Sequence, residues 1–214
     1  GSDRPEGYVK VTFKGEHGTL VEPTVYYANP NKEIWLLQND FTNTMVKNEN
    51  ADIGYTSVGG KWNTESTRLT LSKDTTLTYT FAPLDDVIEK IDEKTEQPKG
   101  YVKVTLIPTD KATKDTKAEK VYFVNPLKPV TIPKFEPVGK KIEADANGNK
   151  YTYEFSFWTS TRGILGTWDK GAVINGQFTP DTDITAKYNI KAEKLITGPI
   201  AKENVITPVD VTPD

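Results

Sequence analysis

The sequence predicts a mainly β protein made of two tandem, homologous β-rich domains. Three observations lead to this expectation. A strand-like run at residues 7–13, Gly-Tyr-Val-Lys-Val-Thr-Phe, returns almost unchanged at residues 100–106. Alternating segments rich in β-branched and aromatic residues occur throughout the chain, whereas helical spacing is hard to find. The 214 residues also suffice for two domains that each bury a core.

The expected strands follow one another in the same way in both halves of the chain. They are expected at residues 8–13, 25–28, 70–81, 121–124, 151–158 and 184–188. Pro30 and Pro126 end two of them, because proline removes a backbone donor and pushes the residue before it toward extended geometry. Asn147-Gly148 predicts a hairpin turn before the fifth strand.

The repeat extends beyond its first seven residues. Further matches occur in the same order: residues 25–30 with 121–126, Trp62 with Trp158, and residues 71–81 with 178–188. The offset is 93 to 96 residues through the Trp pair and 107 in the closing segment, so the second copy contains an insertion near residues 161–177. Solenoids and propellers usually repeat every ~20 to 50 residues, so this longer period indicates one domain per copy.

These matches give the domain boundaries. The first domain is expected at residues 1–84 and the second at residues 100–191. Residues 85–99 are dense in charge and are expected to be a linker, either extended or a short helix with its apolar residues on one side. Residues 192–214 contain three prolines and are expected to form an extended tail.

Composition excludes several classes of function. The chain has no Cys, which excludes disulfides, Cys-ligated zinc, iron–sulfur clusters and thiol catalysis. A net charge of -3 provides no general attraction for nucleic acid or anionic lipid. No segment approaches the ~20 apolar residues that span a bilayer, so membrane insertion is not expected. We expect no cofactor and no metal.

Residues that could perform chemistry are few. His17 is the only histidine and lies in Gly-Glu-His-Gly, which predicts a solvated turn rather than a catalytic base. The alternating oxygen side chains of residues 145–149 resemble a calcium loop, but a hairpin tip with Asx turns explains them as well. Lys10 and Lys103 are the first candidates for an isopeptide bond, although alternation places them on the solvent side of their strands. The chain is therefore not expected to be an enzyme.

The motifs resemble a known class of repeat. The succession Gly-Tyr-Val-Lys-Val-Thr-Phe, Tyr-(Tyr/Phe)-x-Asn-Pro-x-Lys, a Trp hairpin and Asp-Thr-x-(Leu/Ile)-Thr is similar to the tandem repeats of Gram-positive wall-anchored surface proteins, the adhesins. The closing residues 178–188 also resemble the end of the Listeria–Bacteroides repeat, a small β-grasp module. The resemblance implies β-grasp-like or small sandwich domains in an elongated, extracellular module, anchored to the cell wall in the full-length protein. It implies no catalytic residue.

Aromatic residues are the best candidates for binding. Those that recur in both copies, Trp62 and Trp158 among them, are expected in the cores. Trp35 has no partner in the other copy and lies in an apolar run that predicts burial. Trp168, within the insertion, is the first choice for a ligand contact, because an exposed Trp can stack on a sugar or fill a pocket of a partner protein.

The tentative ligand-binding set is Arg162, Trp168 and Asp169. The sequence thus favours a non-catalytic stalk or spacer module of an adhesin that binds a host extracellular protein or glycan and is monomeric within a longer multidomain chain. Two alternatives stay open. One is a dedicated ligand-binding domain that grips its ligand through residues 162–169, and the other is an accessory module of a secreted enzyme.

Overall fold

The computed structural model describes residues 3–37, 40–108, 119–133, 140–142, 148–160 and 174–194. The prediction of a mainly β chain is confirmed. The chain divides into two compact units, Gly1–Asp85 (unit 1) and Asp86–Asp214 (unit 2). Each unit has its own sheets and its own hydrophobic core.

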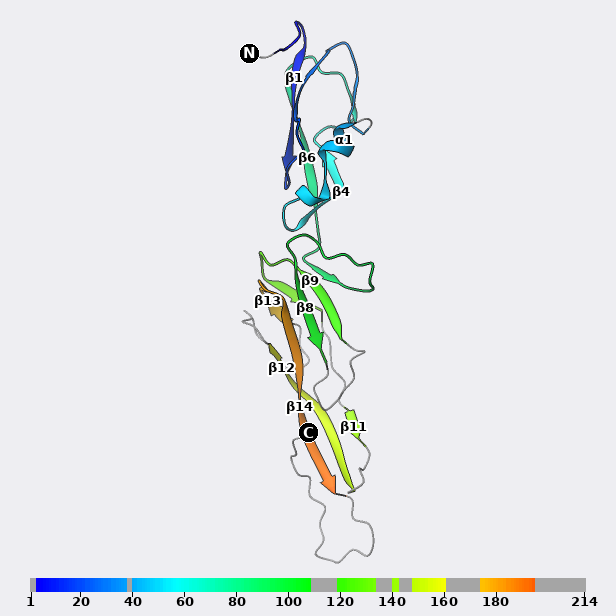
Figure 1. The fold of residues 1–214 in the computed structure, drawn as a ribbon, viewed down its shortest axis with the longest axis vertical. Coiled ribbons are helices and arrows are strands. Elements are labelled where there is room, and N and C mark those ends of the chain that lie inside the picture. The colour runs from blue at the N-terminus through cyan, green and yellow to red at the C-terminus, as the bar shows by residue number, and fades with distance from the viewer. Residues whose placement is uncertain are drawn as a thin grey trace, which may run out of the picture. The chain divides into compact units, whose positions relative to one another are not determined.

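Unit 1 is built on a four-stranded mixed sheet with the order β2-β1-β6-β4. Its strands are β1 (Val9–Glu16), β2 (Val25–Ala28), β4 (Tyr55–Trp62) and β6 (Thr75–Pro83). The first and last of them, β1 and β6, lie side by side in the middle and run parallel (Figure 1). The strands β2 and β4 pair antiparallel with them on the outside. A separate two-stranded sheet consists of β3 (Ile34–Trp35) and β5 (Arg68–Leu69).

Alternation along the central strands decides which side chains form the core of unit 1. In β1, Val9, Val11 and Phe13 are buried, whereas Lys10 and Lys14 are exposed. The same period of two places further apolar residues of β6 on the core side: Leu77, Tyr79 and Phe81. The sheet therefore has one apolar face, which has to be covered.

A short helix helps to cover that face. Parallel strands need a crossover connection, and here it includes α1 (Asp40–Met45) and the 3₁₀ helix η1 (Asn48–Asn50). Phe41 of α1 stacks on Phe13 with ring centroids 5.1 Å apart, and Met45 is 2% exposed. Trp62 Nε1 donates a hydrogen bond of 3.1 Å to Thr42 Oγ1, which fixes the helix to β4. The sequence does not predict α1, because six residues are too few to show a helical period.

Unit 2 is built on a six-stranded sheet with the order β11-β12-β14-β8-β9-β7. Its strands are β7 (Val87–Glu89), β8 (Val102–Ile107), β9 (Lys120–Val124), β11 (Lys140–Ile142), β12 (Asn149–Ser160) and β14 (Thr182–Lys194). β8 and β14 are parallel neighbours, and the other pairs are antiparallel. A small sheet of β10 (Val130–Ile132) and β13 (Ile174–Gly176) adds apolar residues to the core.

Four strands of unit 2 reproduce the sheet of unit 1 in order and in register. The order β9-β8-β14-β12 corresponds to β2-β1-β6-β4, with the parallel pair again in the middle. The paired residues correspond at the sequence offsets of the repeat: Val11↔Thr75 with Val104↔Thr182, Val9↔Ala28 with Val102↔Val124, Trp62↔Tyr79 with Trp158↔Ala186, and Ile34↔Leu69 with Val130↔Gly176. The repeat in the sequence therefore corresponds to a repeat in strand pairing.

The matched tryptophans are buried in both units, but different strands supply the ring that packs on them. In unit 1 the rings are Tyr79 of β6 and Phe13 of β1, with centroids 5.2 and 5.5 Å from that of Trp62. In unit 2, Phe155 of β12 packs on Trp158 with centroids 5.4 Å apart, and the β14 residue that corresponds to Tyr79 is Ala186. Each core thus packs an aromatic ring on its tryptophan, and Tyr79 of β6 has no aromatic counterpart on β14.

Residues 85–99 do not form the helix that was one of the two expectations for them. Val87–Glu89 is the strand β7, which pairs antiparallel with β9 of unit 2. Isoleucine and valine favour a strand, and the edge of β9 supplies the partner for their backbone. At the other end of the chain, β14 continues to Lys194, so residues 192–194 of the predicted tail belong to a strand.

Several other expectations lie outside the described residues. These are residues 195–214 of the tail, residues 161–173 of the insertion and residues 143–147 at the hairpin tip. The strands on either side of that tip, β11 and β12, pair antiparallel, and Gly148 has a φ of 79°.

Candidate functional site

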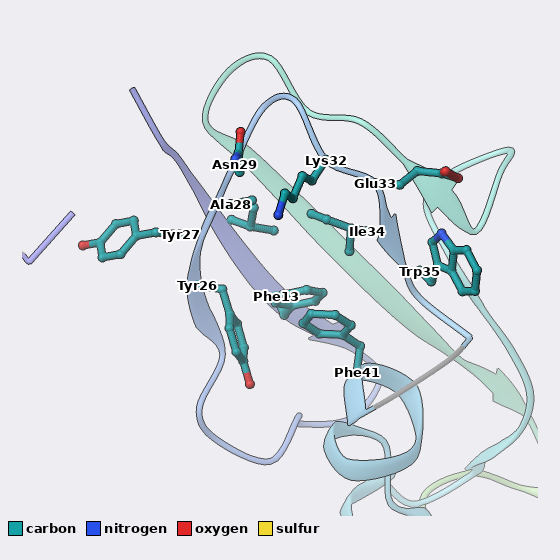
Figure 2. Close-up of a pocket in the computed structure, with 11 residues that line it drawn as sticks. Phe13, Tyr26, Tyr27, Ala28, Asn29, Lys32, Glu33, Ile34, Trp35 and Phe41 are labelled. Atoms are coloured by element: carbon teal, nitrogen blue, oxygen red, sulfur yellow. The ribbon is translucent and has the colours of Figure 1, made fainter. Parts of the chain in front are cut away.

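Unit 1 contains a cavity of about 630 Å³ between β2 and β3 (Figure 2). Side chains of β1 and α1 form its floor, and the turn that joins β2 to β3 forms part of its rim. The cavity exists because β3 does not join the main sheet after that turn and pairs with β5 instead. One edge of β2 therefore faces the cavity rather than another strand.

The turn above the cavity is fixed by its asparagine. Asn29 Oδ1 accepts a hydrogen bond of 2.9 Å from the backbone N–H of Asn31, which is an Asx turn. The carbonyl of Asn29 also accepts one of 3.1 Å from the N–H of Lys32. Unit 2 repeats the Asx turn, because Asn125 Oδ1 accepts a hydrogen bond of 3.0 Å from the N–H of Leu127.

The floor of the cavity is an aromatic cluster. Phe13, which is 3% exposed, stacks on Phe41, and Tyr26 meets both rings edge-on at centroid distances of 5.6 and 5.3 Å. Figure 2 shows these three rings together below the open space, whereas Tyr27 points to the other side of β2. Edge-to-face and offset rings pack favourably on one another, so the floor is a closely packed aromatic surface.

The rim on the β3 side consists of an ion pair between Arg68 and Glu33 and of the indole ring of Trp35, which the guanidinium group covers. Arg68 Nε donates to Glu33 Oε1 at 2.7 Å, and its guanidinium carbon lies 4.2 Å from the centroid of the Trp35 ring. Trp35 is half-buried rather than enclosed in a core as the sequence suggested, because its two-residue strand β3 lies at the surface. At the corresponding position of unit 2, Thr131 Oγ1 donates to Asn175 Oδ1 at 2.7 Å.

The cation of the cavity is Lys32. Its side chain is exposed, and Figure 2 shows its amino group reaching into the space between β2 and β3. Within the described parts of the chain it has no carboxylate partner. Glu33, the nearest acid in sequence, is already paired with Arg68.

Comparison of this chain with family models, with curated proteins and with solved structures gives no match. The chemistry of the cavity therefore has to be read from its own residues. An apolar aromatic floor, one ammonium group and an open strand edge can bind a ligand that has an apolar part, an acidic group and a hydrogen-bonding backbone.

The residues that the sequence proposed for ligand binding, Arg162, Trp168 and Asp169, lie outside the described residues. The remaining candidates can be placed. His17 is exposed at the end of β1, where its ring stacks on Tyr55 with centroids 4.1 Å apart. Lys10 is exposed, as the alternation of its strand predicts.

Two further points concern the described residues only. No group of three or more His, Asp or Glu side chains there is arranged to hold a metal ion. None of the helices there has the length and the apolar character needed to cross a bilayer.

Sequence reasoning missed the cavity itself. The signal was present, because Asn29 and Lys32 recur in the second copy as Asn125 and Lys128. What the sequence could not show is that the two copies differ in what lies beside these residues.

Proposed function

We propose that this chain is a non-catalytic tandem repeat module of a bacterial cell-surface adhesin, in which two homologous β domains act as a stalk or spacer. The observation that supports it best is the shared strand order and register of the two units, at the same offsets as the sequence repeat. Copies of one fold strung along a chain add length, and each copy keeps its own core.

The arrangement of each sheet supports a β-grasp-like description over a sandwich. The first and last strands of the domain are parallel neighbours at the centre, and each is flanked by its antiparallel hairpin partner. In unit 1 the crossover between the two hairpins contains α1, which packs on one face of the sheet. This agrees with the module that the sequence resembles.

The differences between the copies support a scaffold whose surfaces have specialised. The cross-strand pair at the matching position of the small sheet is Trp35 and Arg68 in unit 1 but Thr131 and Asn175 in unit 2. We propose that unit 1 provides the ligand contact of the module through the cavity between β2 and β3. An extracellular, wall-anchored location and an elongated arrangement complete this proposal.

The tandem arrangement is tested by a matched pair of core variants. Val11 and Val104 occupy corresponding buried positions in β1 and β8, and Val→Ala at either is expected to cost about 2 kcal/mol. Each substitution is expected to lower the free energy of unfolding of its own unit and to leave that of the other unit unchanged. Residue-resolved hydrogen exchange measures both. Equal loss of protection in both units from either variant would contradict two independent domains.

The adhesin role is tested on cells and in solution. Antibodies against the chain are expected to label intact cells of the bacterium that makes it, and X-ray scattering of the isolated chain is expected to give an elongated particle. A compact particle counts against the stalk. Labelling only after the cells are broken counts against a surface location.

A further inference from the structure

The segment between the two repeat copies is bound to unit 2. The N–H of Leu84 donates to the carbonyl of Gly54 in unit 1 at 2.8 Å, and the carbonyl of Asp86 accepts a hydrogen bond of 2.9 Å from the N–H of Asn125 in unit 2. Asp85 alone lies between Leu84 and Asp86. Residues 86–100, which include β7, are called the strap below. While the strap stays on unit 2, the connection between the units is a single residue.

Few backbone bonds attach the strap. β7 pairs with β9 over three residues, from Val87↔Val124 to Glu89↔Tyr122, and the N–H of Lys90 donates to the carbonyl of Val121 at 2.8 Å. On its other side, β9 pairs with β8 over five residues. β9 therefore keeps its place in the sheet when the strap is absent.

The strap adds little to the core of unit 2. All its residues are exposed or half-buried, and Ile91 is 83% exposed. Val87 packs against the core cluster without belonging to it, whereas Val104 and Leu106 of β8 are 0% exposed members. Release of the strap therefore removes no member of the core cluster.

Two ion pairs fasten β7 at its ends. The carboxylate of Asp86 lies 2.6 Å from Lys128 Nζ, and that of Glu89 lies 3.6 Å from Lys120 Nζ. All four side chains are 36% to 53% exposed, so salt screens both pairs. The attachment of the strap thus depends on ionic strength more than the apolar core does.

One buried ring favours the closed form. Phe123 of β9 is 4% exposed, lies outside the core cluster and pairs with Ile88 of the strap. Exposing apolar surface of this ring costs free energy when the strap opens. The conformational entropy of the released backbone opposes that cost. The closed form therefore predominates, and the open form is a minor state of the same folded unit.

We infer that the strap opens from unit 2 as a segment of its own while the core of unit 2 stays folded. Opening adds the residues of the strap to the connection between the units, a gain of up to about 50 Å of extended chain. The connection is thus short when the strap is closed and long when it is open. This inference goes beyond the proposed stalk and depends only on unit 2 and the strap, so it stands or falls separately from a surface location.

The test is hydrogen exchange of the ¹⁵N-labelled full chain. The amides of Lys90 and Asn125 report the strap, because each bonds across the junction between the strap and β9. The amides of Leu106 and Ile184, a central pair of residues that are 0% exposed, report the core. After correction for intrinsic rates, the strap amides are expected to exchange at least about 100-fold faster than the core amides. Low urea is expected to change the strap rates little, because a local opening exposes little surface.

Matched variants show what holds the strap. Lys128→Ala removes one ion pair and is expected to speed exchange of the strap amides about three-fold while leaving the core amides unchanged. Lys32→Ala, at the matching position of unit 1, is the control and is expected to change neither set. A rise from 50 to 500 mM NaCl, both chosen concentrations, is expected to act on the strap amides about as Lys128→Ala does. Both lysines are exposed, so the fold is kept.

A reversible lock gives a second measurement. Val87 and Val124 pair directly, and the neighbouring pair Asp86 and Asn125 is hydrogen-bonded, so this pair is the close, non-hydrogen-bonded kind that a disulfide can bridge. The chain has no cysteine of its own, so Val87→Cys with Val124→Cys forms a single defined bond. Oxidation is expected to slow exchange of the strap amides toward the core rate, and reduction is expected to restore it.

Three outcomes would overturn the inference. Equal protection of strap and core amides would mean that the strap opens only when unit 2 unfolds. Equal acceleration of both sets by Lys128→Ala would mean the same. Unchanged exchange of Lys90 and Asn125 in the oxidised double-cysteine variant would mean that these amides do not report release of β7.

Discussion

Asp74 Oδ1 accepts a hydrogen bond of 2.8 Å from the backbone N–H of Lys10. The corresponding residues of unit 2 repeat this bond, with Asp181 Oδ1 2.8 Å from the N–H of Lys103. In both units the aspartate directly precedes the last strand of the domain, and the amide lies near the beginning of the first. The bond therefore ties together the two parallel central strands next to their first rung, Val11↔Thr75 in unit 1.

Asp74→Ala is expected to lower the free energy of unfolding of unit 1, because the N–H of Lys10 loses its acceptor and the nearby Arg4 loses an ion pair of 3.2 Å. Asp74→Asn keeps one acceptor oxygen and is expected to cost less. Urea unfolding followed by tryptophan fluorescence measures both. An Asn variant less stable than the Ala variant would show that the hydrogen bond is not the source of the stability.

The same carboxylate makes the stability of unit 1 depend on pH. The hydrogen bond from Lys10 and the charge of Arg4 hold the pKa of Asp74 below its ordinary value of 3.8, although partial desolvation opposes them. A lowered folded-state pKa contributes stability above the unfolded value, and this contribution is lost as the pH falls through the folded one. The stability difference between the natural chain and Asp74→Asn is thus expected at pH 7 and to shrink below about pH 4. A difference that stays constant down to pH 2.5 would refute the assignment.

Gly60→Ala is expected to destabilise unit 1 by about 1 to 3 kcal/mol. A Cβ at this position of β4 would lie 2.5 Å from Tyr79 Oη and 2.6 Å from ring carbons, and the hydroxyl also donates to the carbonyl of Ser57 at 2.8 Å. Ser156 occupies the matching position of unit 2, where Ala186 stands in place of Tyr79, so Ser156→Ala is the control and is expected to stay within about 0.5 kcal/mol. Thermal unfolding measures both, and equal effects would disprove the close contact as the cause.

Ile88→Pro is expected to detach β7 and to destabilise unit 2 alone. Proline removes the N–H by which residue 88 pairs with Phe123 of β9. Faster hydrogen exchange is expected at Phe123 and Asn125, with unchanged rates in β1 and β6. Ile88→Val, which keeps the strand, is the control. Unchanged exchange in β9 would mean that β7 contributes nothing to the stability of that edge.

Much of the strand pattern could be predicted from the sequence, because alternation and the long repeat both depend on local composition. The repeated Asp-Thr before the closing strand even marks the two aspartates that bind the backbone of the first strand. The matched aromatics were expected in the core, and Trp62 and Trp158 are indeed 7% and 5% exposed. Tyr122 is buried too, whereas Tyr26 is only half-buried, because it lies on the edge strand β2.

The rest depended on contacts that no local pattern reports. β7 has three residues and pairs with β9 more than thirty residues later in the chain, so its charged surroundings suggested a linker. The ring packed on Trp158 could not be read by matching positions, because Tyr79 of β6 has no aromatic counterpart on β14. The cavity arises because β3 pairs with β5 in a separate sheet. Strands of two residues are too short to be recognised from an alternating pattern in the sequence.

The parallel neighbours at the centre of unit 1 also determine how this domain responds to mechanical tension. A pull on the chain before β1 and after β6 acts at opposite ends of this pair, because the two strands run in the same direction. The rungs from Val11↔Thr75 to Glu16↔Thr80 are then sheared together instead of being peeled apart one at a time. A domain with this strand arrangement resists extension by a force applied to its two ends.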